Sequence, residues 1–188
     1  MTVEEIIRQE IRDWSANVLE EPSDFFSGLP PCPYAKRAWS EKKVLISFKR
    51  DSREQDIVNS ISKFSDDYDL HIIVDLAFEE DPEGFEQYLF QLNESISEGA
   101  FGDKDLWLMG FHPNDVHNDV IEDQSFTPLV ETQYALIFVQ RLTKLQEAAD
   151  KLKAKGYYEQ YLQEYDAGHL FEQRQNLYNR LMESKKWR

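Results

Sequence analysis

Four short apolar segments alternate with stretches of helical periodicity, and this alternation restricts the folds that the chain can adopt. The apolar segments, each of strand length, span residues 44–48, 70–76, 106–109 and 134–139. Apolar residues recur at helical spacing over residues 3–19, 52–64, 81–96 and 143–188, the last stretch being broken near Gly156 and Gly168. Strands separated by helices indicate βαβ units. We therefore predict an α/β or α+β fold, in which helices pack on a single small four-stranded mixed sheet and a helical extension ends the chain.

The length of 188 residues suits one domain, and 41% hydrophobic residues are enough for a core. We expect one domain over residues 1–188, with an α/β body over 1–140 and a helical C-terminal extension over 141–188. The extension is rich in tyrosine, so it packs on the body or on a second subunit, and a homodimer is an open alternative.

No apolar run approaches the roughly 18 residues that span a bilayer, and residues 1–20 are amphipathic rather than signal-like. These features predict a cytoplasmic protein without a membrane segment.

Acidic residues are concentrated in the middle of the chain. Residues 51–131 contain 21 acidic and 3 basic residues, whereas the formal charge of the whole chain is −15. This charge disfavours binding to nucleic acid or to anionic lipid. The acidic segment predicts either a solvated face that keeps the protein soluble or a surface for cations or a basic protein partner.

The segment around the only cysteine is rigid and unusual. Prolines flank Cys32 on both sides, and a short helical turn over residues 34–39 follows. If the thiol lies at the start of that turn, the helix dipole and Lys36 are expected to lower its pKa and make it a nucleophile or a metal ligand. Tyr34 and Lys36 are the candidates to bind an anionic group of a cofactor or substrate. The alternative is a small buried apolar residue, because free cysteine is often buried.

Two short motifs carry a family resemblance. The run Leu29-Pro-Pro-Cys-Pro-Tyr-Ala-Lys36 resembles the L-x-x-C-P-F-A signature of an uncharacterised bacterial family of small cytosolic domains, and Phe111-His-Pro113 matches the F-H-P of that family. The order of elements agrees over roughly residues 10–155. The chain departs from the family pattern at Ser125-Phe-Thr-Pro128, where the family has an S-P-Y-P-like segment. No reaction is assigned to that family, so the resemblance implies homology rather than an activity.

A second, shorter likeness concerns the P-C-x-x-A-K run that starts at Pro31. It is similar to haem-dependent N-oxygenases of bacterial amine hydroxylation. A Cys-Pro dipeptide is also the local form found in several haem-responsive proteins, so Cys32 or His112 is a candidate axial haem ligand. Nearby aromatic residues could line an apolar haem pocket; they are Phe25, Phe26, Tyr34, Trp39 and Phe111.

The loop after the third apolar segment contains several possible metal ligands. His112, Asp115 and His117 follow the end of a predicted strand, where α/β sheets often place their sites. The pair His117-x-Asp119 has the spacing of an iron-binding facial triad, but triad oxygenases have a jelly-roll fold that four strands cannot form. His71, which lies among apolar strand residues, is expected to be a core histidine.

Cys32 and His112 are the leading catalytic pair, because a histidine within hydrogen-bond reach of a thiol can activate it. The predicted function is a cytosolic enzyme with a thiol–imidazole site and a small-molecule substrate that the sequence does not identify. Two alternatives stay open. One is a haem- or iron-binding oxidoreductase that uses Cys32 or His112 as a ligand, and the other is a non-catalytic acidic protein that binds a basic partner.

Overall fold

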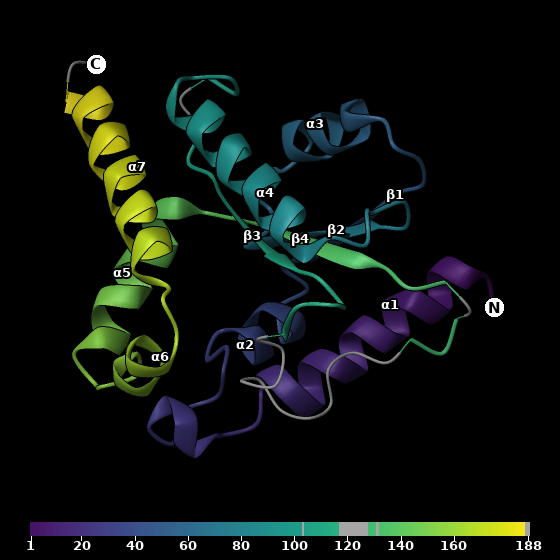
Figure 1. Ribbon diagram of the computed structural model, residues 1–188, viewed down its shortest axis with the longest axis horizontal. Helices are drawn as coiled ribbons and strands as arrows, with labels where there is room; N and C mark the ends of the chain where they lie inside the picture. Colours follow the sequence, from purple (N-terminus) through teal and green to yellow (C-terminus); the bar gives the residue numbers. More distant parts are fainter. Residues whose placement is uncertain (103, 117–127, 131, 187–188) are drawn as a thin grey trace.

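The computed structural model describes residues 1–102, 104–116, 128–130 and 132–186 (Figure 1). The strands are β1 (Val44–Lys49), β2 (Leu70–Asp75), β3 (Trp107–Phe111) and β4 (Ala135–Gln140). The α-helices of this part of the chain are α1 (Val3–Trp14), α2 (Ala35–Ser40), α3 (Glu54–Ser62), α4 (Pro82–Ser97), α5 (Leu142–Lys153), α6 (Glu159–Glu164) and α7 (Gly168–Lys186). A π-helical turn (Ser15–Leu19) extends α1, and a 3-10 turn (Asp24–Phe26) follows it.

The four strands form one open mixed sheet with the order β1-β2-β4-β3. β1 and β2 are parallel, and β4 is antiparallel to both β2 and β3. β1, β2 and β3 therefore run in the same direction, and their carboxyl ends meet at one edge of the sheet. We call this the carboxyl edge and the opposite one the amino edge. The predicted fold class, a small four-stranded mixed sheet with helices and a helical C-terminal part, is confirmed.

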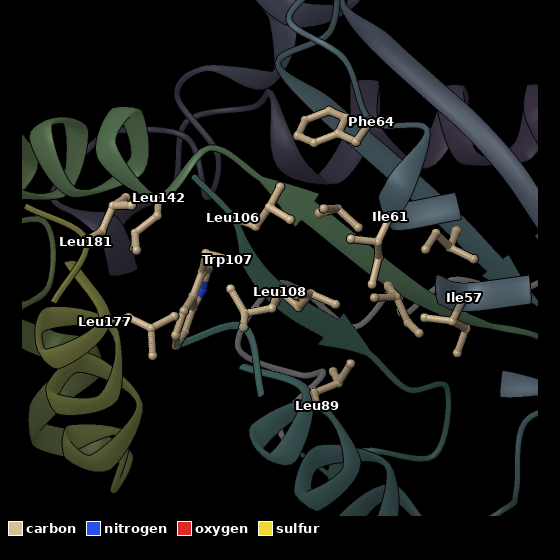
Figure 2. Packing of buried hydrophobic residues seen from close by; sticks show 14 residues of the cluster. Ile57, Ile61, Phe64, Leu89, Leu106, Trp107, Leu108, Leu142, Leu177 and Leu181 are labelled. Carbon is tan, nitrogen blue, oxygen red and sulfur yellow. The ribbon is translucent and has the colours of Figure 1, made fainter. Parts of the chain in front are cut away.

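One face of the sheet is covered by α3 and α4 (Figure 1). Alternate strand residues point toward these helices, and the buried cluster there includes Ile61, Leu89 and Ile137. Leu177 and Leu181 of α7 join the same cluster beside Trp107 (Figure 2). The C-terminal helices thus contribute to the core of the sheet.

The other face is covered by α1. Its residues Ile7, Ile11 and Trp14 are buried against β-strand residues of the opposite set. Thr2 and Glu5 form a reciprocal capping box that starts the helix. The expected helix over residues 3–19 is thus observed, with a change to π-helical hydrogen bonding in its last turn.

The boundaries of the strands, of α3 and of α4 differ from the expected ones by at most two residues. The expected C-terminal helical stretch is divided into α5, α6 and α7 by non-helical residues 154–158 and 165–167. None of the helices in the part of the chain that the structure describes is long and apolar enough to cross a membrane.

Candidate functional site at the carboxyl edge of the sheet

The carboxyl edge brings together residues that follow three different strands. Lys49 ends β1, Asp75 ends β2, and His112 directly follows β3. Lys49 and Asp75 are register partners in the parallel pair, so their side chains start from adjacent positions. Ends of parallel strands are the usual place for sites in sheets of this kind.

Lys49 and Asp75 form a buried ion pair. The Lys49 ammonium donates to both oxygens of the Asp75 carboxylate at 2.9 and 2.8 Å, and both side chains are almost fully buried. The Ala77 amide also donates to Asp75 at 2.9 Å. Burial, together with the negative charges of Glu54 and Asp75, raises the pKa of Tyr88 on α4 to about 12. A buried ion pair of this kind helps to fix the register of β1 against β2. Both charged groups are almost inaccessible to solvent.

Sequence reasoning missed this ion pair. The available signal was a lysine directly after one predicted strand and an aspartate next to the end of another. That signal becomes visible only when the strand register is known.

His112 is buried, with 2% of its surface exposed. Its Nδ1 accepts a hydrogen bond from the Asn114 amide at 3.2 Å, and its Nε2 lies 2.9 Å from the Glu79 carbonyl oxygen. These partners assign the neutral tautomer with the proton on Nε2. The ring packs edge-to-face on Phe78 and lies against Phe85. The geometry makes His112 a link between the end of β3 and the loop that follows β2.

Cys32 lies in the loop between the 3-10 turn and α2. Its amide donates to the Leu19 carbonyl, and the neighbouring Pro31 carbonyl accepts a hydrogen bond from the Tyr157 hydroxyl. Burial raises the pKa of the Cys32 thiol, and this effect outweighs the lowering by the backbone N–H groups of Tyr34 and Ala35. The expected lowering of the thiol pKa is therefore wrong. The thiol does sit at the start of the helical turn, but two amides do not compensate for the loss of water.

The other candidates around Cys32 face outward. Tyr34 is 46% exposed, and Lys36 is exposed. The contacts that the structure describes for Cys32 come from the segments around Leu19 and Tyr157, whereas those of His112 come from residues 78–85 and Asn114. The catalytic pairing of Cys32 with His112 stays a prediction.

Four of the five aromatic residues proposed for a haem pocket belong to two separate clusters. Phe25 and Phe26 pack with Tyr157, whereas Trp39 and Phe111 pack with α1 on the sheet. These four side chains therefore fill two different parts of the core, and the exposed Tyr34 belongs to neither cluster.

Of the proposed metal ligands, Asp115 is half-buried and its amide donates to the His112 carbonyl. His117 and Asp119 lie outside the described residues. Among the residues that the structure describes, no group of three or more His, Cys, Asp or Glu side chains is placed to hold a metal ion.

Six exposed carboxylates lie at the carboxyl edge, in the first turn of α3, in the loop after β2 and in the first turns of α4. We call this set the acidic edge surface; it consists of Glu54, Glu79, Glu80, Asp81, Glu83 and Glu86. Asp81 caps α4 by accepting from the Glu83 amide at 3.1 Å. Carboxylates at helix starts are favoured by the helix dipole, which explains their local stability.

The cations close to the acidic edge surface form ion pairs with carboxylates that do not belong to it. Lys49 is buried with Asp75, and Arg53 pairs with Asp51 at 2.7 Å. Arg50 pairs with Glu4 of α1. Within the described residues, the one ion pair made by a member of the surface joins Glu86 to His169 at 3.5 Å.

The amino edge has a different charge arrangement. Three of its carboxylates pair with cations: Asp66 with Arg141 at 3.0 Å, Asp69 with Lys144 at 2.8 Å and Glu41 with Arg37 at 2.8 Å. Among the described residues, the negative charge is therefore partly compensated at the amino edge, where Asp67 and Glu98 make no ion pair, and is less compensated at the carboxyl edge.

A small hollow lies at the amino edge, between the end of α4 and α7. Its volume is about 70 Å³, and its floor is formed by Leu106, Leu142 and Leu177, with Lys104 and Arg180 at the rim. Both cations bond to neighbouring Ser62 and Ser97. Pockets for small-molecule ligands usually measure about 300 Å³ or more, so this hollow has room for little more than a few water molecules.

Comparison with family models, with curated proteins and with solved structures finds no match to this chain. The resemblance of the L-x-x-C-P-Y-A and F-H-P motifs to the bacterial family stays a prediction.

Proposed function

We propose that this protein is an interaction protein that binds a basic protein segment, rich in lysine and arginine, through the acidic edge surface. The observation that carries this proposal is the unequal pairing of charge at the two edges of the sheet. Three carboxylates of the amino edge, Glu41, Asp66 and Asp69, form ion pairs within the chain, whereas Glu79, Glu80, Asp81 and Glu83 make none among the described residues.

Uncompensated like charges repel one another and lower stability, so their concentration at one edge has an energetic cost in the free protein. A cationic partner removes that repulsion on binding. Complementary charge also accelerates association and selects partners by sign.

The position of the surface favours the same function. The carboxylates lie on two helix starts and on a loop that His112 and Asn114 fix by hydrogen bonds to the Glu79 and Glu80 carbonyls. The backbone is therefore held in place while the Glu79 and Glu80 side chains extend into solvent. A preorganised charged surface binds with less loss of conformational freedom than a mobile acidic tail.

Two variants of equal net charge test the proposal. Glu79→Lys/Glu80→Lys reverses charge on the acidic edge surface, and Asp67→Lys/Glu98→Lys reverses two exposed carboxylates at the amino edge. Binding of a fluorescent peptide of alternating lysine and arginine is measured by anisotropy. We expect the first variant to bind at least about tenfold more weakly than the unaltered protein, and the second to bind within about twofold of it.

Salt dependence provides a second readout, because exposed charges interact less as ionic strength rises. Binding of the unaltered protein should weaken steeply between roughly 50 and 200 mM salt. Equal losses in both variants would show that net charge alone matters, and no binding by the unaltered protein would refute the proposal.

A further inference from the structure

The sheet has two edge strands, β1 and β3, each paired with another strand on one side only. Such edges are a common route to self-association, and proteins usually protect them. In the antiparallel pair of β3 with β4, alternate residues direct their N–H and C=O away from the partner. Leu108 is one of these residues, and Gly110 follows two positions later in the same orientation.

The outer backbone groups of Leu108 are occupied by one side chain. The Leu108 amide donates to Asn93 Oδ1 at 3.0 Å, and Asn93 Nδ2 donates to the Leu108 carbonyl at 2.9 Å. Asn93 belongs to α4 and is 2% exposed. Its carboxamide therefore reproduces the two hydrogen bonds that a neighbouring strand would make at this position.

The close approach of α4 to β3 requires a glycine on the strand. A Cβ atom on Gly110 would lie 2.4 Å from Leu89 Cδ1 and 2.5 Å from Phe85 Cε1. Leu89 and Leu108 pack together in the core between helix and strand (Figure 2). Gly110 thus lets α4 lie near enough for Asn93 to reach the strand backbone.

The other edge strand, β1, is protected in a related way. Arg8 of α1 donates through Nη2 to the Ile46 carbonyl of β1 at 3.0 Å, and its guanidinium lies over the Phe48 ring at 5.0 Å. On each edge strand, therefore, a side chain from a covering helix forms a hydrogen bond with the strand backbone.

We propose that Asn93 is an edge guard that prevents β3 from pairing with β3 of a second copy of the chain. A second copy is the fitting partner because β3, Trp107-Leu-Met-Gly-Phe111, has no charged residue that would repel its own copy across an antiparallel pair. Met109 is 44% exposed beside the guarded position, so an apolar contact is available once the backbone is free.

The test compares Asn93→Ala with Asn59→Ala, a control on an exposed asparagine of α3. Molar mass is measured by light scattering over a range of protein concentrations. We expect the mass of Asn93→Ala to rise toward twice that of the monomer as concentration increases, while the unaltered protein and the control keep a constant mass. Adding Met109→Lys to Asn93→Ala should restore the monomer, because a charge at an edge opposes strand pairing.

A folded Asn93→Ala protein that stays monomeric at every concentration would overturn the proposal, and so would self-association that Met109→Lys leaves unchanged. If Asn93→Ala does not fold, Asn93→Leu keeps the approximate size of the side chain and removes both its donor and its acceptor without adding a charge. Hydrogen exchange of the unaltered protein needs no variant. The Leu108 amide should exchange as slowly as amides of the central strand β4. Rapid exchange would contradict the proposal that the Asn93 side chain protects this amide.

Discussion

The buried histidine of β2 is expected to make the stability of the fold depend on pH. His71 is 1% exposed, and its Nε2 lies 2.8 Å from the Ser47 hydroxyl. Burial lowers the pKa of His71 from 6.5 to about 4; the Ser60 carbonyl opposes this shift and the Lys63 charge adds to it. The expectation that His71 is a core histidine is confirmed, although its buried Nδ1 has no hydrogen-bond partner among the described residues.

The sign of the effect follows from comparing the two states. In the unfolded chain the imidazole takes up a proton below about pH 6.5, whereas in the folded protein it remains neutral until about pH 4. The stabilisation is therefore complete above 6.5 and is lost as the pH falls from 6.5 toward 4. Each tenfold difference in proton affinity corresponds to about 1.4 kcal/mol, so the total loss is about 3 kcal/mol.

The assay is urea unfolding of the unaltered protein and of His71→Gln at several values between about pH 7 and pH 4. Glutamine keeps a polar group near Ser47 and does not titrate. Carboxylates titrate in both proteins, so the difference between the two curves isolates His71. We expect the unaltered protein to lose about 3 kcal/mol more than the variant over this range. Parallel curves would refute the assignment.

Three further changes have defined expected results. Gly110→Ala should lower the free energy of unfolding by about 1–3 kcal/mol, because the new methyl group meets Leu89 and Phe85; an unchanged urea midpoint would contradict this. Lys49→Met should cost about 3–5 kcal/mol by leaving Asp75 buried without its partner, and adding Asp75→Leu should recover part of that loss; a larger loss in the double variant would argue against a simple pair. Cys32 should react with a thiol reagent at least about tenfold more slowly in the folded protein than in urea, and equal rates would show an accessible thiolate.

Local patterns predicted most of the secondary structure. Thr2 and Glu5 have the spacing of a capping box at the start of α1, and Asp81-Pro82 is a typical N-cap followed by proline at the start of α4; both caps are present. Alternating strands and helices also predicted the class of the fold, because only a few arrangements bury such segments. These signals are local, so the sequence displays them directly.

The order of the strands in the sheet, and the side-chain contacts that depend on it, could not be predicted in the same way. The insertion of β4 between β2 and β3 depends on packing between segments far apart in the chain. The bonds from Asn93 to Leu108 and from Lys49 to Asp75 follow from that arrangement. The thiol pKa of Cys32 also depends on tertiary burial, which the flanking prolines do not indicate.

NMR titration with a basic peptide, followed through the backbone amide resonances, tests most directly whether the acidic edge surface is the binding surface. On adding a peptide of alternating lysine and arginine, we expect shifts concentrated in residues 51–54 and 79–86, which reverse on adding salt. Shifts centred on the amino edge, over residues 63–69 and 98–102, or no shifts at any peptide concentration, would contradict the account.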